Sequence, residues 1–148
     1  MWSYTLLAHC SASTATVETW LEGRFGQADE RGWVRHGALS FAVRGRGMSS
    51  VDFDDQLDGP ITIEIPWFIE NRGDPDAREE AVRGLFVTVP HLVTEFDASA
   101  LFLWERDVVY MARVGGEIVI YDRCLDWFRP DVQRFLPPHT VSSEYRPA

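Results

Sequence analysis

The sequence predicts an α+β fold of two layers, in which a mainly antiparallel sheet packs against helices on one face. Short segments rich in apolar and β-branched residues are joined by tight turns, which is typical of hairpins. Two longer segments with three- and four-residue apolar spacing separate these groups, which indicates inserted helices. We expect about six strands, two main helices and a short C-terminal helix, in the order β-α-β-β-β-α-β-β-β-α.

The first third of the chain is expected to hold a strand, a helix and a hairpin. The strand covers residues 2–10. A helix starts in the Ser/Thr/Ala cluster at residues 11–16, because these side chains cap helix N-termini, and it ends at Gly23 or Gly26. Residues 32–44 are predicted to form two short strands.

An alternating segment and a long helix follow. Isoleucines alternate with polar residues over 61–65, which predicts a strand with one apolar face. Asp74 is the predicted N-cap of the main helix and Pro75 its first residue. Pro90 is expected to kink this helix or to split it near Thr88. The predicted core-facing stripe of the helix comprises Ala81, Val82, Leu85, Phe86, Val89, Leu92, Val93 and Phe96.

Three consecutive strands form the clearest part of the sequence, because β-branched and aromatic residues dominate it. Gly115-Gly116 stands between the second and the third, and both glycines tolerate the positive φ angles of a two-residue hairpin turn. The strands are predicted over residues 100–105, 108–114 and 117–121.

The length of 148 residues fits one domain. Pro130 is expected to open the last helix, which runs to about Leu136 before two prolines stop it. A single α+β domain is therefore predicted over residues 1–138, followed by a C-terminal tail over residues 139–148.

Composition and charge exclude several classes of function. The formal net charge of −9 comes from 14 basic and 23 acidic residues. This balance argues against partners such as nucleic acid or an anionic membrane, because both require a basic surface. All the basic residues are arginine, which excludes chemistry that depends on lysine, such as Schiff-base formation.

The compartment is predicted from the two cysteines and from the absence of long apolar runs. A secreted disulfide scaffold would carry more cysteines, so Cys10 and Cys124 are expected to be reduced thiols that form no disulfide. No apolar run approaches the ~18–20 residues of a membrane helix. We expect a cytoplasmic protein.

No catalytic, metal or cofactor motif is evident in the sequence. The histidines at positions 9, 36, 91 and 139 do not stand at metal-ligand spacing, and no Gly-x-Ser-x-Gly elbow occurs. The aspartates that start at Asp52 lack the glycine and glutamate that a calcium loop requires. We therefore expect no enzyme activity, no metal and no cofactor.

Acidic residues concentrate in one segment. Residues 52–80 hold ten of them, against Arg72 and Arg78 alone. One interpretation is a solvated loop followed by a helix N-terminus, where acids are common. The other is a surface that steers a basic partner. Phe53 is its expected exposed aromatic anchor, whereas Trp67 could equally belong to this surface or to the core. The candidate partner-binding residues are Asp52, Phe53, Asp54, Asp55, Asp58, Glu70, Asp74, Asp76, Glu79 and Glu80.

The second half of the chain carries a pattern found in a known family. It begins with Asp97-Ala98-Ser99-Ala100-Leu101-Phe102-Leu103-Trp104, continues through Val108-Val109-Tyr110-Met111-Ala112-Arg113, Gly116 and Glu117-Ile118-Val119-Ile120, and ends with Trp127 and Pro130-Asp131-Val132. This pattern resembles the polymorphic-toxin immunity proteins of the myxobacterial social-exclusion (Sit) type. The resemblance covers about residues 60–136, most closely 97–136. It implies a cytosolic antidote that binds and neutralises a cognate toxin, without assigning any toxin-binding residue.

The expected function is therefore that of an immunity protein, with two alternatives. One is a general protein-binding adaptor or a phage-related module. The other is a small-ligand binder, or an enzyme whose site is assembled from distant residues. A deep apolar pocket with convergent polar groups would favour the second alternative, and a flat acidic face would favour protein binding. The oligomeric state is left open.

Overall fold

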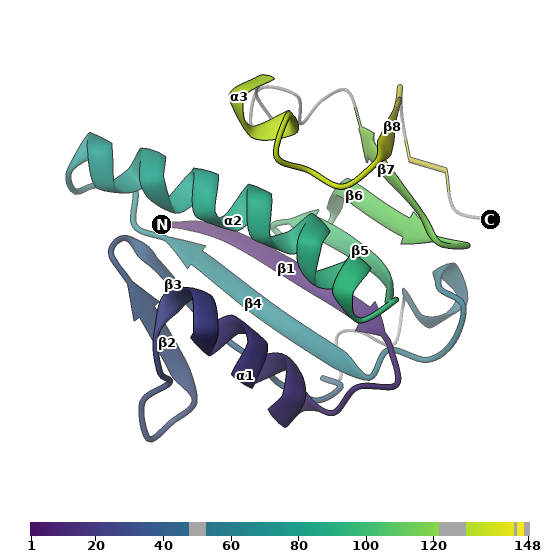
Figure 1. Cartoon of the computed structure of the whole chain (residues 1–148), viewed down its shortest axis with the longest axis horizontal. Coiled ribbons are helices and arrows are strands. Elements are labelled where there is room, and N and C mark those ends of the chain that lie inside the picture. Colours follow the sequence, from purple (N-terminus) through teal and green to yellow (C-terminus); the bar gives the residue numbers. More distant parts are fainter. Residues whose placement is uncertain (48–52, 122–129, 144, 147–148) are drawn as a thin grey trace.

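The computed structural model describes residues 1–47, 53–121, 130–143 and 145–146, and it confirms the α+β class (Figure 1). Three helices and eight strands are present in this part of the chain. The helices are α1 (Thr14–Phe25), α2 (Pro75–Glu95) and α3 (Pro130–Gln133). The strands are β1 (Trp2–His9), β2 (Trp33–His36), β3 (Leu39–Ala42), β4 (Ile63–Ile69), β5 (Ser99–Trp104), β6 (Val108–Val114), β7 (Glu117–Tyr121) and β8 (His139–Ser142).

All eight strands belong to one sheet, in the order β2-β3-β4-β1-β5-β6-β7-β8. Neighbouring strands are antiparallel except β7 and β8, which are parallel. β1 lies inside the sheet between β4 and β5, and Leu6 is paired with Ile65 on one side and with Phe102 on the other. The first strand of the chain therefore joins the two halves of the sheet.

The helices α1 and α2 lie over the same face of the sheet (Figure 1). Tyr4 of β1 is paired with Trp67 of β4, so their side chains share a face. The ring of Tyr4 meets Phe86 of α2 edge-on at 5.5 Å, and Trp67 meets Phe25 of α1 at 6.4 Å. These two contacts place both helices on that side.

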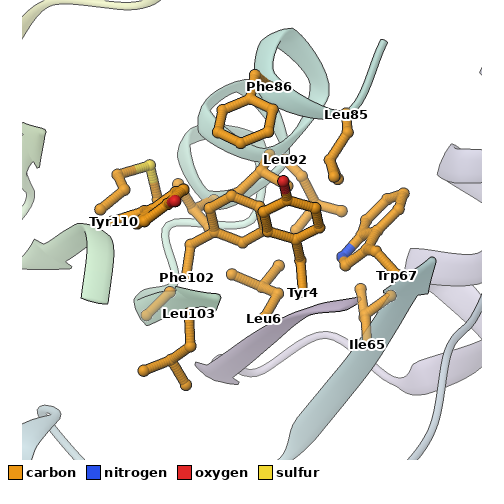
Figure 2. Close-up of a cluster of buried hydrophobic side chains, with 14 of the residues drawn as sticks. Tyr4, Leu6, Ile65, Trp67, Leu85, Phe86, Leu92, Phe102, Leu103 and Tyr110 are labelled. Atoms are coloured by element: carbon orange, nitrogen blue, oxygen red, sulfur yellow. The ribbon is translucent and has the colours of Figure 1, made fainter. Parts of the chain in front are cut away.

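The core under α2 is built from stacked and edge-on aromatic rings (Figure 2). Tyr4 stacks on Phe102 with ring centroids 5.7 Å apart, and Phe86 meets Phe102 edge-on at 5.5 Å. β6 carries one extra residue at Tyr110, because Phe102 pairs with Met111 while Leu103 pairs with Val109. This bulge adds the Tyr110 ring to the same cluster, 6.2 Å from Tyr4.

Both main helices are capped as the sequence predicts. The Ser13 side chain accepts a hydrogen bond from Thr16 N, and Asp74 accepts one from Asp76 N. α1 ends at Gly26, whose φ of 107° suits glycine. Of the two outcomes predicted for Pro90, a kink or a split near Thr88, the split is wrong, because residues 75–95 form one continuous helix. Thr88, Val89 and Pro90 are buried, and this packing offsets the hydrogen bond that proline cannot donate.

The end of the chain differs most from the expectation. Residues 139–142, predicted to be part of a tail, form β8 and pair with β7, which adds an eighth strand to the seven of the predicted order. Their β-branched Thr140 and Val141 suit an edge strand. α3 ends at Gln133 rather than near Leu136, because Phe135 N and Leu136 N bond to carbonyls only three residues back.

Cys10 carries a free thiol, while Cys124 lies outside the described residues. None of the helices in the described part of the chain is both long and apolar enough to cross a membrane.

Two polar atoms are buried in the core without a hydrogen-bond partner among the described residues, namely the Tyr4 hydroxyl and Trp67 Nε1. Burial is the main cause that raises the pKa of the Tyr4 hydroxyl, and the charges of Tyr110 and Glu105 raise it further. A buried hydroxyl without a partner costs free energy on folding, because it loses its bonds to water.

We expect Tyr4→Phe to leave the free energy of unfolding unchanged within ~1 kcal/mol, or to raise it, because it removes an unpaired polar atom and keeps the ring. Urea denaturation monitored by circular dichroism measures this. Leu6→Ala is the control for a true loss of packing, with an expected decrease of ~2–5 kcal/mol. A clear destabilisation by Tyr4→Phe would mean that the hydroxyl has a bonding partner.

Candidate functional site

The structure divides the acidic candidates into two groups, one at each end of β4. Asp54, Asp55 and Asp58 precede this strand, whereas Glu70, Asp74, Asp76, Glu79 and Glu80 follow it around the start of α2. Seven residues of strand, at ~3.3 Å each, separate the groups by about 20 Å. Asp52 lies outside the described residues. The segment that is continuous in sequence therefore forms two separate surfaces.

Within β4, Glu64 is buried and belongs to neither group. Its Oε1 accepts a hydrogen bond from Arg106 Nη2 at 2.7 Å. Glu64 is paired with Leu7, which places both on the face opposite the helices.

The loop over residues 53–60 is held by its own acidic residues. Asp54 Oδ1 accepts a hydrogen bond from Ile61 N at 3.0 Å, and Oδ2 forms an ion pair with Arg46. The Ile61 N–H is the main cause that holds the pKa of the Asp54 carboxyl below its usual value, and Arg46 lowers it further. Phe53, expected to be exposed, is half-buried and packs against the hydrophobic core. Asp54 and Phe53 thus stabilise the loop itself.

Asp58 and Pro60 attach this loop to the sheet. Asp58 N donates to Ser99 Oγ at 3.0 Å, and Asp58 Oδ2 accepts from Gly115 N at 3.3 Å. His9 Nδ1 donates to the Pro60 carbonyl at 2.7 Å, because a carbonyl can only accept. The loop is therefore fixed to the ends of β1 and β6 and to the start of β5.

A polar pocket of about 440 Å³ lies where these elements meet. Its walls come from the end of β1, the loop, the junction of α2 with β5, and the β6–β7 turn. The polar side chains that line it are His9, Cys10, Ser11, Asp58, Asp97, Ser99 and Arg113. Both acidic residues, Asp58 and Asp97, are exposed, and we call them the acidic rim.

Arg113 is the buried charge of this pocket. Its guanidinium donates to the Ala98 carbonyl and to Asp97 Oδ1, both at 2.9 Å. The Asp97 side chain is 89% exposed, and the residue has a φ of 46°, a left-handed conformation that few residues other than glycine adopt. Arg113 therefore holds one carboxylate of the acidic rim in a fixed position at the mouth of the pocket.

The sequence predicted Asp58 as a candidate but missed Asp97 and Arg113. One signal was available, because Arg113 stands alone in an otherwise apolar strand and a buried charge requires a partner. The identity of that partner depends on the fold, which brings residue 97 beside residue 113.

The chemistry of the pocket is that of polar recognition. In the neutral form of His9, the bond from Nδ1 to Pro60 leaves Nε2 as an acceptor. Among the described residues, no three His, Cys, Asp or Glu side chains are arranged to hold a metal ion. The pocket thus offers two exposed carboxylates, an imidazole and two serine hydroxyls beside one guanidinium that is already paired.

We expect the stability of the loop to depend on the ionisation of Asp54. Because its pKa is lower in the folded than in the unfolded chain, the stabilisation is complete above the usual value of 3.8 and is lost as the pH falls through the folded value. Urea denaturation between pH 7 and pH 3 should show a smaller decrease for Asp54→Asn than for the wild type. Asp55→Asn, an exposed change in the same loop, is the control. Equal slopes for wild type and Asp54→Asn would contradict this role.

Comparison of the chain with protein-family models, with curated proteins and with solved structures gave no match. The function of the chain is therefore inferred from its sequence and from the geometry of its pockets and surfaces.

Proposed function

We propose that this chain is an immunity protein that binds a basic toxin through the acidic rim of the polar pocket and so neutralises it. The observation that carries the proposal is the convergence of Asp58 and Asp97. They come from different segments of the chain, both are exposed, and both line the same pocket. A basic partner would place a cationic side chain between them.

The charges around the pocket support a cation rather than an anion as its occupant. Asp58 and Asp97 contribute two negative charges, and Arg113 contributes one positive charge that is already paired with Asp97. The whole chain carries a formal charge of −9, and this charge attracts a basic protein by long-range electrostatics before the two surfaces touch. Complementary charge of this kind mainly raises the rate of association.

The rigidity of the rim also suits recognition. Asp58 is held by Ser99 and Gly115, and Asp97 is held by Arg113. Side chains that are already fixed lose less conformational entropy on binding. The acidic residues at the start of α2 have a local role instead, since Asp74 caps the helix and Asp76 lies in its first turn.

A protein-binding adaptor would use the same surface, so growth of the host distinguishes it from an immunity protein. We expect co-expression of this chain to restore growth of cells that produce the product of the adjacent gene, and the two proteins to purify together. A neighbouring product that neither inhibits growth nor binds this chain would contradict the immunity function.

For the purified pair, we expect Asp58→Asn with Asp97→Asn to slow association several-fold at low salt and to flatten its salt dependence, because the change removes two charges that steer the partner. Asparagine preserves an acceptor for Arg113 and tolerates the positive φ at position 97. Stopped-flow fluorescence at low and high salt measures both effects.

The matched control is Glu70→Gln with Asp76→Asn, which removes the same charge at the other end of β4. If this variant slows association while the rim variant does not, the recognition surface lies at the start of α2. If neither variant changes the rate, acidic steering is excluded.

A further inference from the structure

A second hollow, of different chemistry, lies between α1 and α2 on the helical face of the sheet. It has a volume of about 410 Å³, within the range of small-molecule pockets. Its apolar lining comprises Phe25, Leu39, Ala81, Gly84, Val87 and Phe135. Leu39 and Ala81 are buried beneath it, whereas Phe135 is 53% exposed. We call this hollow the helix groove.

Gly84 keeps the helix groove open. It lies inside α2, where glycine is less favourable than any ordinary residue except proline. A Cβ atom added at Gly84 would lie 3.4 Å from Phe25 Cε1, at the edge of ordinary van der Waals contact. No described residue is close enough to require glycine here, so a side chain at this position would fill only the groove.

Basic side chains line the groove beside its apolar walls. Arg24 stacks over the Trp20 ring at 4.5 Å and forms no ion pair with the described residues. Arg83 Nη2 is 3.2 Å from Asp131 Oδ2, an exposed pair that occupies one of the five guanidinium donors. The lining also contains the His36 ring and the carboxylate of Glu80.

We infer that the helix groove binds a small amphipathic monocarboxylate, with its apolar body against Phe25 and Val87 and its carboxylate on Arg24. Apolar walls beside an unpaired guanidinium match such a molecule, because arginine binds a carboxylate through two parallel hydrogen bonds. Glu80 and the pairing of Arg83 with Asp131 leave too little positive charge to favour a doubly charged head group. This ligand is distinct from the basic protein proposed for the acidic rim.

The test uses decanoate as the probe and the full chain labelled with ¹⁵N. We expect saturable shifts of the amide signals of Leu39, Gly84 and Val87, and a rise in melting temperature with decanoate concentration. Decyltrimethylammonium has the same apolar body with the opposite charge and should bind at least ten-fold more weakly. Equal binding of the two probes would overturn the role of the arginines, and the absence of saturable shifts would overturn the site.

Two variants separate the apolar part of the groove from its charge. Gly84→Leu should weaken decanoate binding at least ten-fold without loss of helix content, because leucine is a good helix former and fills the groove. Arg24→Gln should weaken decanoate several-fold and leave the binding of decanol unchanged. Arg35→Gln, an exposed arginine on the neighbouring β2, is the matched control and should change neither.

If Gly84→Leu folds poorly, the comparison of Arg24→Gln with its control Arg35→Gln still decides the proposal. Wild-type affinity of Arg24→Gln for decanoate would then refute it. Saturable binding of an acidic, apolar peptide, with no saturable binding of decanoate, would assign the groove to a protein segment instead. Each measurement uses this chain alone, so its result does not depend on whether the toxin partner exists.

Discussion

The pairing of β1 with β4 on one side and β5 on the other is the constraint on which the rest of the structure depends. Leu6 and Leu7 are both buried, so this strand is covered on both faces of the sheet. Near the start of β1, Tyr4 contacts Phe86 of α2. At the end of β1, His9 lines the polar pocket. A change in the register of β1 would exchange its two faces and so disturb the helical layer and the pocket together.

The parts of the fold that the sequence predicted depend on local chemistry. Neighbours within a few residues determine the isoleucine alternation that starts β4 at residues 63–65, the helix caps in the 11–16 cluster and at Asp74, and the Gly115-Gly116 turn. β8 is different, because its four residues become a strand only where the edge of β7 is available. The bulge at Tyr110 likewise reflects how rings from four elements, β1, α2, β5 and β6, fit together. The spacing of residues within one strand carries no information about that fit.

The candidate site shows the same limit. A run of charge along the sequence suggests one surface, but β4 lies within the run and carries its two ends apart. In the opposite direction, Asp97 was absent from the acidic segment and is brought beside Asp58 by the β5–β6 pairing and the loop over residues 53–60. The density of charge along the sequence therefore identified Asp58, and only the arrangement of the strands shows that Asp97 joins it in the acidic rim.

The central position of β1 also has a consequence for the order of events during synthesis. Its partners are distant in sequence, since Trp2 pairs with Ile69 and Tyr4 with Trp104. At ~5–20 residues per second, a nascent chain waits roughly 5–20 s between making β1 and making the strand that completes its second edge. Both edges of this apolar strand are unpaired until β4 is made, and one edge stays unpaired until β5 follows. The high contact order of this topology thus predicts slow folding and a period of exposure to aggregation that a chaperone would have to cover.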